Sequence, residues 1–345
     1  MSVGWGLIGC GRIANVWMAP AIQAVNGSAL VAVLSRDLHR AHAFAGRHGA
    51  KRAYDDLDAF LRDPEVEAVY IATTNNVHAE QTIRCAKAGK HVLCEKPMAT
   101  SIDDAQRMIA ACHDAGVKLG LNYHMRAFPI NRLARQLIAD GRIGQPQVAK
   151  ASLAVLLPED ARAWRPRPDF MGGVIMDLAT HCVNLLRYLL NDQVVEVASL
   201  ADQQMFRQGA EDSALCLLRF SRGTLAFVHA GYNIPFAENG YEIQGTLCTL
   251  TGHRLIGQRP GGNLDLISPD GLQTLAHEET NPYESHVASF NAAIRSGGDV
   301  LTSGEEGLED LMVGFALRRR GAGEENRAVE QLDERREPIE VTCLH

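Results

Sequence analysis

The stretch Trp5-Gly6-Leu7-Ile8-Gly9-Cys10-Gly11-Arg12-Ile13-Ala14 places a short apolar run before a glycine turn, and a helical pattern over residues 13–25 follows it. The turn has the spacing G-x-G-x-x-G/A. The first glycine permits a tight turn, the second lets a pyrophosphate approach the backbone, and a small third residue lets the helix pack on the strand. The helix N-terminus offers free N–H groups to an anion. The pattern predicts a dinucleotide site that includes Gly9, Gly11, Arg12 and Ile13; the alternative is a glycine turn without a ligand.

The alternation of strand and helix patterns continues to about residue 122. Apolar runs at 29–34, 66–72, 91–94 and 117–121 alternate with helical patterns at 39–48, 80–88 and 102–115. This spacing indicates right-handed parallel crossovers. We therefore predict an α/β protein that begins with a Rossmann domain, a doubly wound parallel sheet, over residues 1–122.

The second part of the chain follows a different pattern. Helical patterns at 130–140, 174–190, 285–295 and 305–319 surround a strand at 147–156 and a series of strands between 194 and 267. Strands joined by turns without helices indicate a largely antiparallel sheet. We predict a C-terminal α+β domain with an open sheet over residues 123–345, and we expect part of the charged tail from Arg318 onward to be solvated.

Composition excludes several classes of protein. The chain has 345 residues, 46% hydrophobic and 22% charged, which is typical of a soluble globular protein of two domains. The net charge of −7 argues against a nucleic-acid partner, and no apolar run reaches the ~18 residues of a membrane helix. There is no secretory signal pattern at the N-terminus. The eight cysteines form no CxxC pair, so we expect free thiols in a reducing cytoplasm rather than disulfides or zinc.

The end of the second predicted strand bears on the choice between NAD and NADP. NAD sites usually place an acidic residue there to hold the ribose 2′-hydroxyl. This chain has Ser35 and Arg36 instead, with Arg40 close behind, and arginines suit a 2′-phosphate. Asp37 comes two positions late and is expected to cap the following helix. NADP(H) is therefore the preferred cofactor, and NAD(H) the alternative.

Glu95-Lys96-Pro97 directly follows the fourth predicted strand. Ligands of such folds bind at the carboxyl edge of the sheet, and Pro97 restricts the backbone of Lys96. An isolated lysine is usually a surface residue. At this edge, however, an ammonium group could stabilise a developing alkoxide and donate a proton to it.

Asp177 and His181 lie four residues apart on the predicted long helix and should share one face. We expect Asp177 to orient His181 and raise its basicity, so that the imidazole can exchange a proton with a substrate hydroxyl. The alternative is a structural His–Asp pair. Zinc is disfavoured because no third ligand has a suitable spacing, so no metal is predicted.

Other polar groups lie at predicted strand ends or near the glycine pair Gly172-Gly173. Each also has a purely structural interpretation, such as a polar turn, a helix cap or a cation–π contact. The candidates for cofactor contact are Thr73, Thr74, Asn75, His78 and Asn122, and those for substrate contact are Tyr123, Trp164 and Arg165, with Asp177 and His181.

Together these motifs resemble the glucose-fructose oxidoreductase / inositol dehydrogenase family over residues 5–317. The resemblance rests on the glycine turn, Thr74-Asn75 with His78, Glu95-Lys96-Pro97, and Gly172-Gly173 followed by Asp177 and His181. It implies catalytic positions for Lys96, Asp177 and His181, and cofactor contacts by Gly9, Gly11, Thr74, Asn75, His78 and Glu95. It also implies that the open sheet can mediate dimerisation. Within the family, the reductases of anhydro ketosugars are most similar, and these use NADPH.

The resulting hypothesis is hydride transfer from nicotinamide to the carbonyl carbon of a ketosugar. Lys96 would polarise and protonate the oxygen, while His181, held by Asp177, would act on a neighbouring hydroxyl. One alternative is an NAD(P)-dependent dehydrogenase of inositol or a sugar. The other is a non-catalytic sensor that binds NADP.

Overall fold

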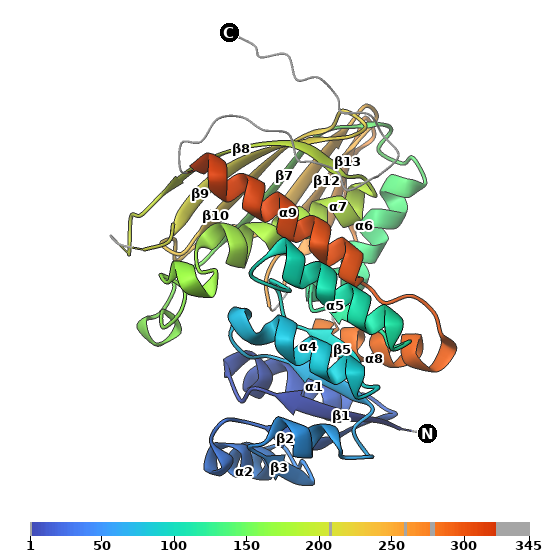
Figure 1. Cartoon of the computed structure of the whole chain (residues 1–345). Helices are drawn as coiled ribbons and strands as arrows, with labels where there is room; N and C mark the ends of the chain where they lie inside the picture. The colour runs from blue at the N-terminus through green and yellow to red at the C-terminus, as the bar shows by residue number, and fades with distance from the viewer. Residues whose placement is uncertain (1, 207–208, 259–260, 277–279, 322–345) are drawn as a thin grey trace.

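A computed structural model describes residues 2–206, 209–258, 261–276 and 280–321. Most of the charged tail from Arg318 therefore lies outside the described residues. Figure 1 shows two lobes, one at the N-terminal, blue end of the chain and the other built around a large sheet. Within the described part, no helix is both long and apolar enough to span a bilayer.

The first lobe contains the predicted doubly wound sheet. Its six parallel strands have the order β3-β2-β1-β4-β5-β6. Every residue of β1 is buried, as expected for a strand covered on both faces. The strands are β1 (Val3–Ile8), β2 (Ser28–Leu34), β3 (Arg52–Tyr54), β4 (Ala68–Ile71), β5 (His91–Cys94) and β6 (Leu119–Leu121).

The helices between these strands follow the predicted pattern with two differences. The short strand β3 and a short helix over Leu57–Leu61 were not predicted, and the first helix begins irregularly. The expected helix 13–25 starts as a wide π-turn, η1 (Ala14–Met18), and continues as α1 (Ala19–Ala24). Pro20, which has no N–H to donate, lies at this transition. The other helices are α2 (Leu38–Arg47), α3 (Leu57–Leu61), η2 (Asn75–Val77), α4 (His78–Lys87) and α5 (Ile102–Asp114).

The second lobe is an eight-stranded sheet of order β14-β13-β12-β11-β7-β10-β9-β8. All neighbours are antiparallel except β7 and β10, which confirms the expected largely antiparallel sheet. Along β9, buried and exposed residues alternate, so one face is covered and the other is open. The strands are β7 (Pro146–Ala154), β8 (Val194–Asp202), β9 (Ser213–Phe220), β10 (Leu225–Gly231), β11 (Tyr241–Gly245), β12 (Thr249–His253), β13 (Asn263–Ser268) and β14 (Gly271–Leu275).

Helices cover one face of this sheet (Figure 1). Helix α9 (Gly304–Gly321) packs on β8, and α7 (Thr180–Leu190) packs on β7 and α6 (Pro129–Ala139). The short turns η4 (Glu159–Ala161) and η5 (Pro168–Phe170) and the π-turn η6 (Ile175–Ala179) complete this lobe, while η3 (His124–Ala127) lies between β6 and α6, where the chain passes from the first lobe to the second.

Helix α8 (Pro282–Ser296) belongs structurally to the first lobe, although it lies late in the chain. The ring of Phe290 lies 5.5 Å from that of Trp5, and Trp5 Nε1 donates to Asn291 Oδ1 at 3.1 Å. Tyr283 and Val287 are buried in the same cluster as Trp5. The predicted boundary at residue 123 separates the two sheets, but it places α8 in the second domain. The sequence could not show that α8 packs on the first lobe, because its partners there lie almost a whole chain length away.

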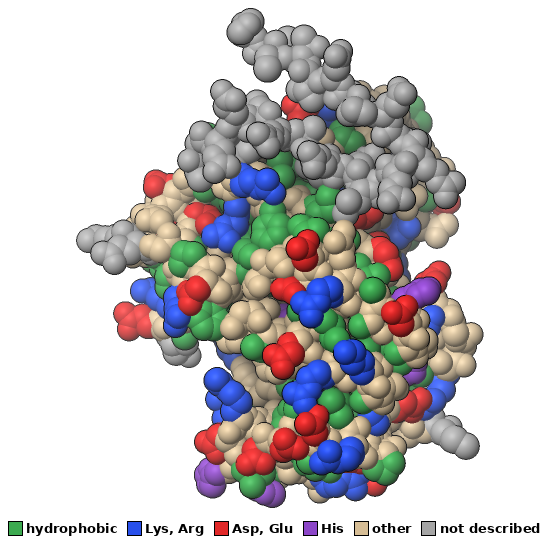
Figure 2. All heavy atoms as spheres, viewed as in Figure 1, with side chains coloured by type: hydrophobic (Ala, Val, Ile, Leu, Met, Phe, Trp, Pro, Cys, Tyr) green, Lys and Arg blue, Asp and Glu red, His purple; other side chains and the backbone are tan. Residues whose placement is uncertain are grey.

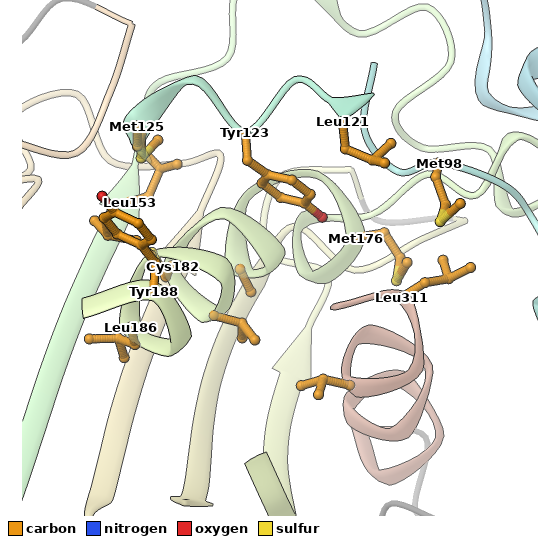
Figure 3. Close-up of a cluster of buried hydrophobic side chains, with 14 of the residues drawn as sticks. Met98, Leu121, Tyr123, Met125, Leu153, Met176, Cys182, Leu186, Tyr188 and Leu311 are labelled. Carbon is orange, nitrogen blue, oxygen red and sulfur yellow. The ribbon is translucent and has the colours of Figure 1, made fainter. Parts of the chain in front are cut away.

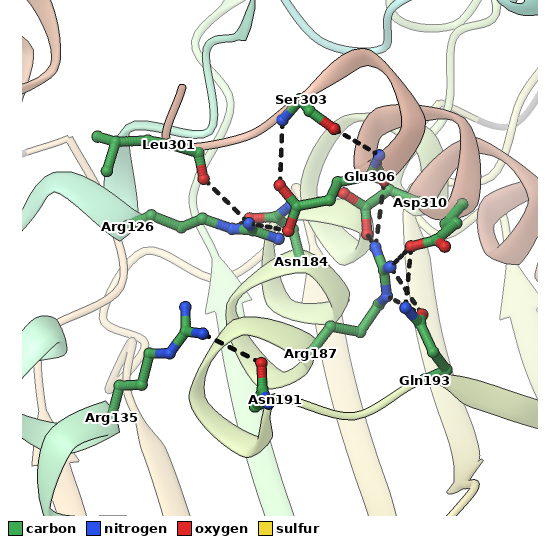
Figure 4. Close-up of polar contacts among 11 residues, drawn as sticks. Arg126, Arg135, Asn184, Arg187, Asn191, Gln193, Leu301, Ser303, Glu306 and Asp310 are labelled. Atoms are coloured by element: carbon green, nitrogen blue, oxygen red, sulfur yellow. Dashed lines mark hydrogen bonds and ion pairs between the residues drawn. The ribbon is translucent and has the colours of Figure 1, made fainter. Parts of the chain in front are cut away.

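Two features fix the lobes against each other. Figure 3 shows a buried apolar cluster in which Met98 and Leu121 of the first lobe meet Met176 and Leu311 of the second. Figure 4 shows the buried guanidinium of Arg126, which donates to Asn184 Oδ1 at 2.9 Å and pairs with Glu306. Because Arg126 belongs to η3, this network fixes the turn that follows β6 against α7 and α9.

The side of the molecule that carries α4, α5 and α9 has no surface of a single charge sign. Figure 2 shows basic and acidic side chains interspersed over it. Such mixing does not create the extended positive potential that holds nucleic-acid phosphates.

Candidate active site

The glycine turn has the geometry of a pyrophosphate site. Gly9 has φ +101°, and a Cβ there would lie 2.6 Å from the carbonyl oxygen of Ala72. A Cβ on Gly11 would meet only that oxygen, at an ordinary 3.7 Å. Gly9 is therefore required by the fold, whereas Gly11 leaves room beside the start of the helix for a ligand. Arg12 is exposed and Ile13 half-buried at the same turn.

The predicted 2′-phosphate residues lie just after β2 (Ser35 and Arg36) and in the first turn of α2 (Arg40). Arg40 Nη2 donates to the carbonyl oxygen of Cys10 at 2.7 Å, so its guanidinium lies against the glycine turn. Asp37 Oδ1 accepts from the backbone N–H groups of His39 and Arg40, and the expected helix cap is confirmed. Ser35 is half-buried and Arg36 exposed.

The turn after β4 is fixed by side chains that were expected to contact a cofactor. The ring nitrogens of His78 lie 3.0 Å from the carbonyl oxygen of Pro97 and 3.2 Å from that of Thr73. His78 is also completely buried. The predicted cofactor contact by His78 is therefore wrong; its ring joins the turns after β4 and β5 instead.

Neighbouring residues of the same turn are partly committed to protein contacts. Thr73 Oγ1 donates to Gln81 Oε1 at 2.7 Å, and Asn75 Nδ2 donates to the carbonyl oxygen of Phe170 at 2.8 Å. Asn75 therefore joins the first lobe to the η5 turn of the second. Thr74 is half-buried and precedes η2.

Glu95 is held at the edge of the sheet by two neighbouring strands. Its Oε1 accepts from Asn122 Nδ2 at 2.6 Å and from the hydroxyl of Tyr70. Burial raises the pKa of Glu95, although these hydrogen bonds oppose the shift. Asn122 Oδ1 is buried without a hydrogen-bond partner in the described structure. An orphaned buried acceptor of this kind is expected where a ligand completes the site.

Lys96 crosses from the first lobe to the second. Its ammonium lies 2.6 Å from Asp177 Oδ1 and 2.7 Å from the carbonyl oxygen of Asp177, and both side chains are largely buried. Two of the predicted catalytic residues, Lys96 and Asp177, thus meet in a direct ion pair that the sequence reasoning did not anticipate. Lysine has three N–H donors, so one remains beyond these two contacts.

Asp177 is the centre of a wider polar network. Its Oδ2 accepts from Arg165 Nε at 2.8 Å and from the hydroxyl of Tyr232 at 2.7 Å. Burial opposes ionisation of Asp177, but the charges of Lys96 and Arg165 outweigh it and hold its pKa well below the usual range. Tyr232 was missed by the sequence reasoning because nothing near the end of β10 marks it.

The Trp164-Arg165 pair shows the structural interpretation considered for it, and its contact with a substrate stays a prediction. The guanidinium carbon of Arg165 lies 4.7 Å from the ring centre of Trp164, which is the structural cation–π contact. The same guanidinium also reaches Asp177. The loop that carries the pair presses on Gly172, where a Cβ would lie 2.3 Å from the carbonyl oxygen of Arg165. This close approach requires the glycine.

His181 is buried beside this network without a hydrogen bond to Asp177 among the described contacts. Its Nδ1 has no partner. Burial lowers the pKa of His181 well below its ordinary value, and the charges of Lys96 and His124 lower it further. The expected orientation of His181 by Asp177 is therefore wrong, since no described hydrogen bond joins them. The charge of Asp177 does raise the pKa of His181 as expected, but burial outweighs it. The π-turn η6 contains Asp177, and its i→i+5 bonds change the angle between residues four apart.

Rings rather than hydrogen bonds surround His181. Tyr123 and His124 approach it edge to face, with ring centres at 5.6 Å and 5.5 Å. Tyr123 is itself buried in the cluster between the lobes (Figure 3). Direct substrate contact by Tyr123 is therefore not supported, and its ring packs against His181 instead.

The described residues contain no group of three or more His, Cys, Asp or Glu side chains arranged to hold a metal ion. The polar atoms that lack partners near Lys96 are an amide oxygen and an imidazole nitrogen. Such atoms suit an organic ligand with hydrogen-bonding groups.

Comparisons with known proteins agree with this geometry. The chain is 39% identical to 1,5-anhydro-D-fructose reductase of Ensifer adhaerens, over 91% of this chain and 94% of that protein. It is 27% identical to myo-inositol 2-dehydrogenase of Thermotoga maritima, over 94% and 97%. The structure of aldose-aldose oxidoreductase from Caulobacter crescentus superposes with a TM-score of 0.86 at 27% identity, covering 93% of this chain and 98% of that one.

Family descriptions cover both lobes. Residues 3–123 match the oxidoreductase family with an NAD-binding Rossmann fold, and residues 131–251 match the GFO/IDH/MocA C-terminal domain. The resemblance seen in the motifs is confirmed over most of the chain: this protein is an oxidoreductase of the GFO/IDH/MocA family.

Proposed function

We propose that the enzyme transfers a hydride between NADP(H) and the carbonyl carbon of a ketosugar of the 1,5-anhydrofructose type. The observation that carries the proposal is the ion pair between Lys96 of the first lobe and Asp177 of the second, beside the buried His181. Similarity to a reductase of this substrate class over nearly the whole chain supports it.

Lys96 acts on the carbonyl oxygen. Two of its N–H donors are engaged by Asp177, and the third is available to the substrate. As the carbonyl carbon gains a hydride, negative charge develops on oxygen, where an ammonium group stabilises it and donates a proton. Asp177 stays ionised and holds the ammonium in place.

His181 contacts the substrate as a neutral imidazole. Its lowered pKa keeps it uncharged near neutral pH, and a neutral imidazole can accept or donate one hydrogen bond through Nε2, the ring nitrogen that is not among the buried, unpartnered atoms. A sugar hydroxyl next to the carbonyl satisfies this nitrogen. Arg165 and Trp164 supply a donor and an apolar face on the same side.

NADP(H) supplies the hydride when bound. The backbone of the glycine turn would hold its pyrophosphate, since Gly11 leaves space there. The nicotinamide end would lie by Asn122, whose orphaned Oδ1 needs a donor. The proposed contacts are Gly9, Gly11, Arg12 and Ile13 at the pyrophosphate; Ser35, Arg36 and Arg40 at the 2′-phosphate; and Thr73, Thr74, Asn75, Glu95, Lys96 and Asn122 near the nicotinamide.

The second candidate is oxidation of an inositol or sugar hydroxyl, favoured by similarity to myo-inositol 2-dehydrogenase over 94% of the chain. The same groups serve this direction, because Lys96 would then accept the hydroxyl proton instead of donating it.

The test is NADPH absorbance during incubation with 1,5-anhydrofructose and other ketosugars, and with NADP⁺ or NAD⁺ and polyols. NADPH oxidation with an anhydro ketosugar is the expected result. Turnover confined to polyols would favour the second candidate. An enzyme that turns over neither class would contradict the proposal.

We further propose that two copies pair through the open face of the large sheet. Side chains there are apolar and exposed, including Leu200 at 76% and Leu217 at 58%. The register places Leu215 opposite Leu200 and Phe227 opposite Leu217, so the apolar residues form one contiguous patch. Sedimentation should give a dimer, and Leu217→Lys with Leu200→Lys should give a monomer. A wild-type monomer at micromolar concentration would contradict pairing.

We also propose that the enzyme acts in the cytoplasm. All seven cysteines of the described residues are free, as expected for a reducing compartment. Localisation of a tagged full-length chain tests this assignment.

A further inference from the structure

The imidazole of His181 needs something to hold it. A catalytic imidazole is usually oriented by a hydrogen bond to its second nitrogen. In the described part of the chain, however, Nδ1 is buried without a partner, and Asp177 is committed to Lys96, Arg165 and Tyr232. The rings of Tyr123 and His124 contact that of His181 edge to face.

His124 is itself held from two sides. Its Nε2 lies 3.1 Å from the carbonyl oxygen of Gly257, and its ring stacks on that of Tyr283 with centres 4.7 Å apart and planes 15° apart. Tyr283 stacks in turn on Trp17, at 5.4 Å and 17°. Trp17 belongs to η1, the turn that follows the glycine-rich loop.

These contacts form a continuous ring column, which we define as Trp17, Tyr283, His124 and His181. It runs from the first helical turn of the nucleotide lobe, through α8 and η3, to α7 of the second lobe. The members come from four separate segments of the chain, so no local pattern produces the column. Arg126, two residues after His124, fixes η3 against α7 and α9.

We propose that His124 is a positioning residue of the reaction, whose ring, clamped on Tyr283, holds His181 toward the substrate and excludes water from it. This inference rests on the proposed role of His181. His124 does not touch the reacting atoms in this account. It acts indirectly, because it orients His181 and keeps water away from the imidazole of His181.

A change of pH response distinguishes this role from general support of the fold. The titratable groups that face His181 are Lys96 from the end of β5, Asp177 from η6, His124 from η3 and Tyr123 just before η3. Burial is the largest cause of the lowered pKa of His181. If His124 is replaced by a small residue, water enters and this pKa rises toward its ordinary value of about 6.5.

The experiment compares His124→Ala with His124→Phe, which keeps a ring in place. In the Ala variant, kcat should fall about 10- to 100-fold through misorientation of His181. The acidic limb of the profile of kcat against pH should move to higher pH, while the dissociation constant of NADPH should stay unchanged. In the Phe variant, kcat and the position of the acidic limb should both be close to those of the wild type. His113→Ala, which removes an exposed histidine at the end of α5, is the matched control.

A second readout does not depend on turnover. NMR titration of histidine-labelled protein, with His181→Asn to identify the signal, gives the pKa of His181 directly. It should rise in His124→Ala and stay low in His124→Phe. An absence of turnover in the wild type contradicts the proposed function, whereas the titration still tests the contact.

Two results would overturn the inference. One is wild-type kcat and wild-type His181 titration in His124→Ala. The other is equal damage by Ala and Phe, since the ring would then not be what matters. If the Ala variant fails to fold, Tyr283→Leu removes the ring that stacks on His124 and should raise the pKa of His181 in the same way. Tyr283→Phe keeps that ring and should leave the pKa of His181 low.

Discussion

The two lobes hold their site residues by different means. In the nucleotide lobe, Glu95 follows β5 and is bonded by Tyr70 of β4 and by Asn122, which directly follows β6. The strands β4 and β6 flank β5 in the sheet. In the second lobe, Asp177 is bonded by Lys96 from the end of β5 in the other sheet, by Arg165 from a loop and by Tyr232 from the end of β10. The first arrangement follows from strand order, whereas the second depends on a balance of charges. Loss of one partner should therefore cost more in the second lobe, because it leaves a buried charge undercompensated.

The largest expected effect is that of Lys96→Ala, which removes the charge that joins the lobes. Loss of the proton donor should lower kcat by about 10²- to 10⁴-fold, while the dissociation constant of NADPH changes little. Steady-state kinetics and NADPH fluorescence titration measure the two quantities. Lys118→Ala, a lysine that donates to the backbone of Gly297, is the control. Retention of more than a tenth of wild-type kcat would refute the role of Lys96.

Arg40→Ala probes the nucleotide lobe at its opposite end. If the guanidinium holds a 2′-phosphate, its removal costs a charged hydrogen bond, so the preference for NADPH over NADH should fall about 10- to 100-fold. The KM for NADH should stay near the wild-type value. Equal loss with both cofactors would show that Arg40 merely supports the glycine turn through Cys10.

Two tyrosines allow a direct comparison of the lobes. Tyr232→Phe removes a donor to Asp177, and Tyr70→Phe removes one to Glu95. We expect Tyr232→Phe to lower kcat about tenfold, the cost of one hydrogen bond to a charged group. Tyr70→Phe should do less, because burial raises the pKa of Glu95 and Asn122 remains bonded to it. The reverse order would mean that the nucleotide lobe is the more sensitive of the two.

The smallest effect at neutral pH concerns buried histidines. Burial lowers the pKa of His124 to about 4 and that of His286 to about 3. In the unfolded chain each titrates near 6.5. Between these pH values the unfolded state binds more protons than the folded state. The contribution of each histidine to the free energy of unfolding is therefore fully present above about pH 6.5 and decreases as the pH falls. Each histidine should contribute a slope of about 1.4 kcal/mol per pH unit.

Urea unfolding measures this slope at several pH values, from about two units below to about half a unit above the ordinary histidine pKa of about 6.5. His286→Phe should reduce it by the share of one group, and His113→Ala, with an exposed ring, should leave it unchanged. An unaltered slope in His286→Phe would indicate that this histidine binds its proton in the folded state.

Sequence reasoning was most successful where function follows local order along the chain. Gly9, Glu95, Lys96 and Asn122 lie in or next to turns that follow parallel strands, and parallel strand ends meet at one edge. The alternation of patterns was therefore enough to bring them together.

It was least successful where contacts cross the chain. Tyr232 reaches Asp177 from 55 residues away, and α8 returns to Trp5 from the far end. The pairing of Asp177 with His181 was expected from helical spacing, but the π-turn alters that spacing. The burial of His78 was hidden because its partners are backbone carbonyls, which carry no sequence signal.

The position of α8 has a consequence for biosynthesis. One side of the parallel sheet, where Trp5 lies, is covered by a helix that ends at Ser296. When only the first 122 residues have left the ribosome, the part of this apolar side that α8 covers is still exposed. The nucleotide lobe is therefore completed only after residue 296 has emerged, and until then the exposed surface favours aggregation.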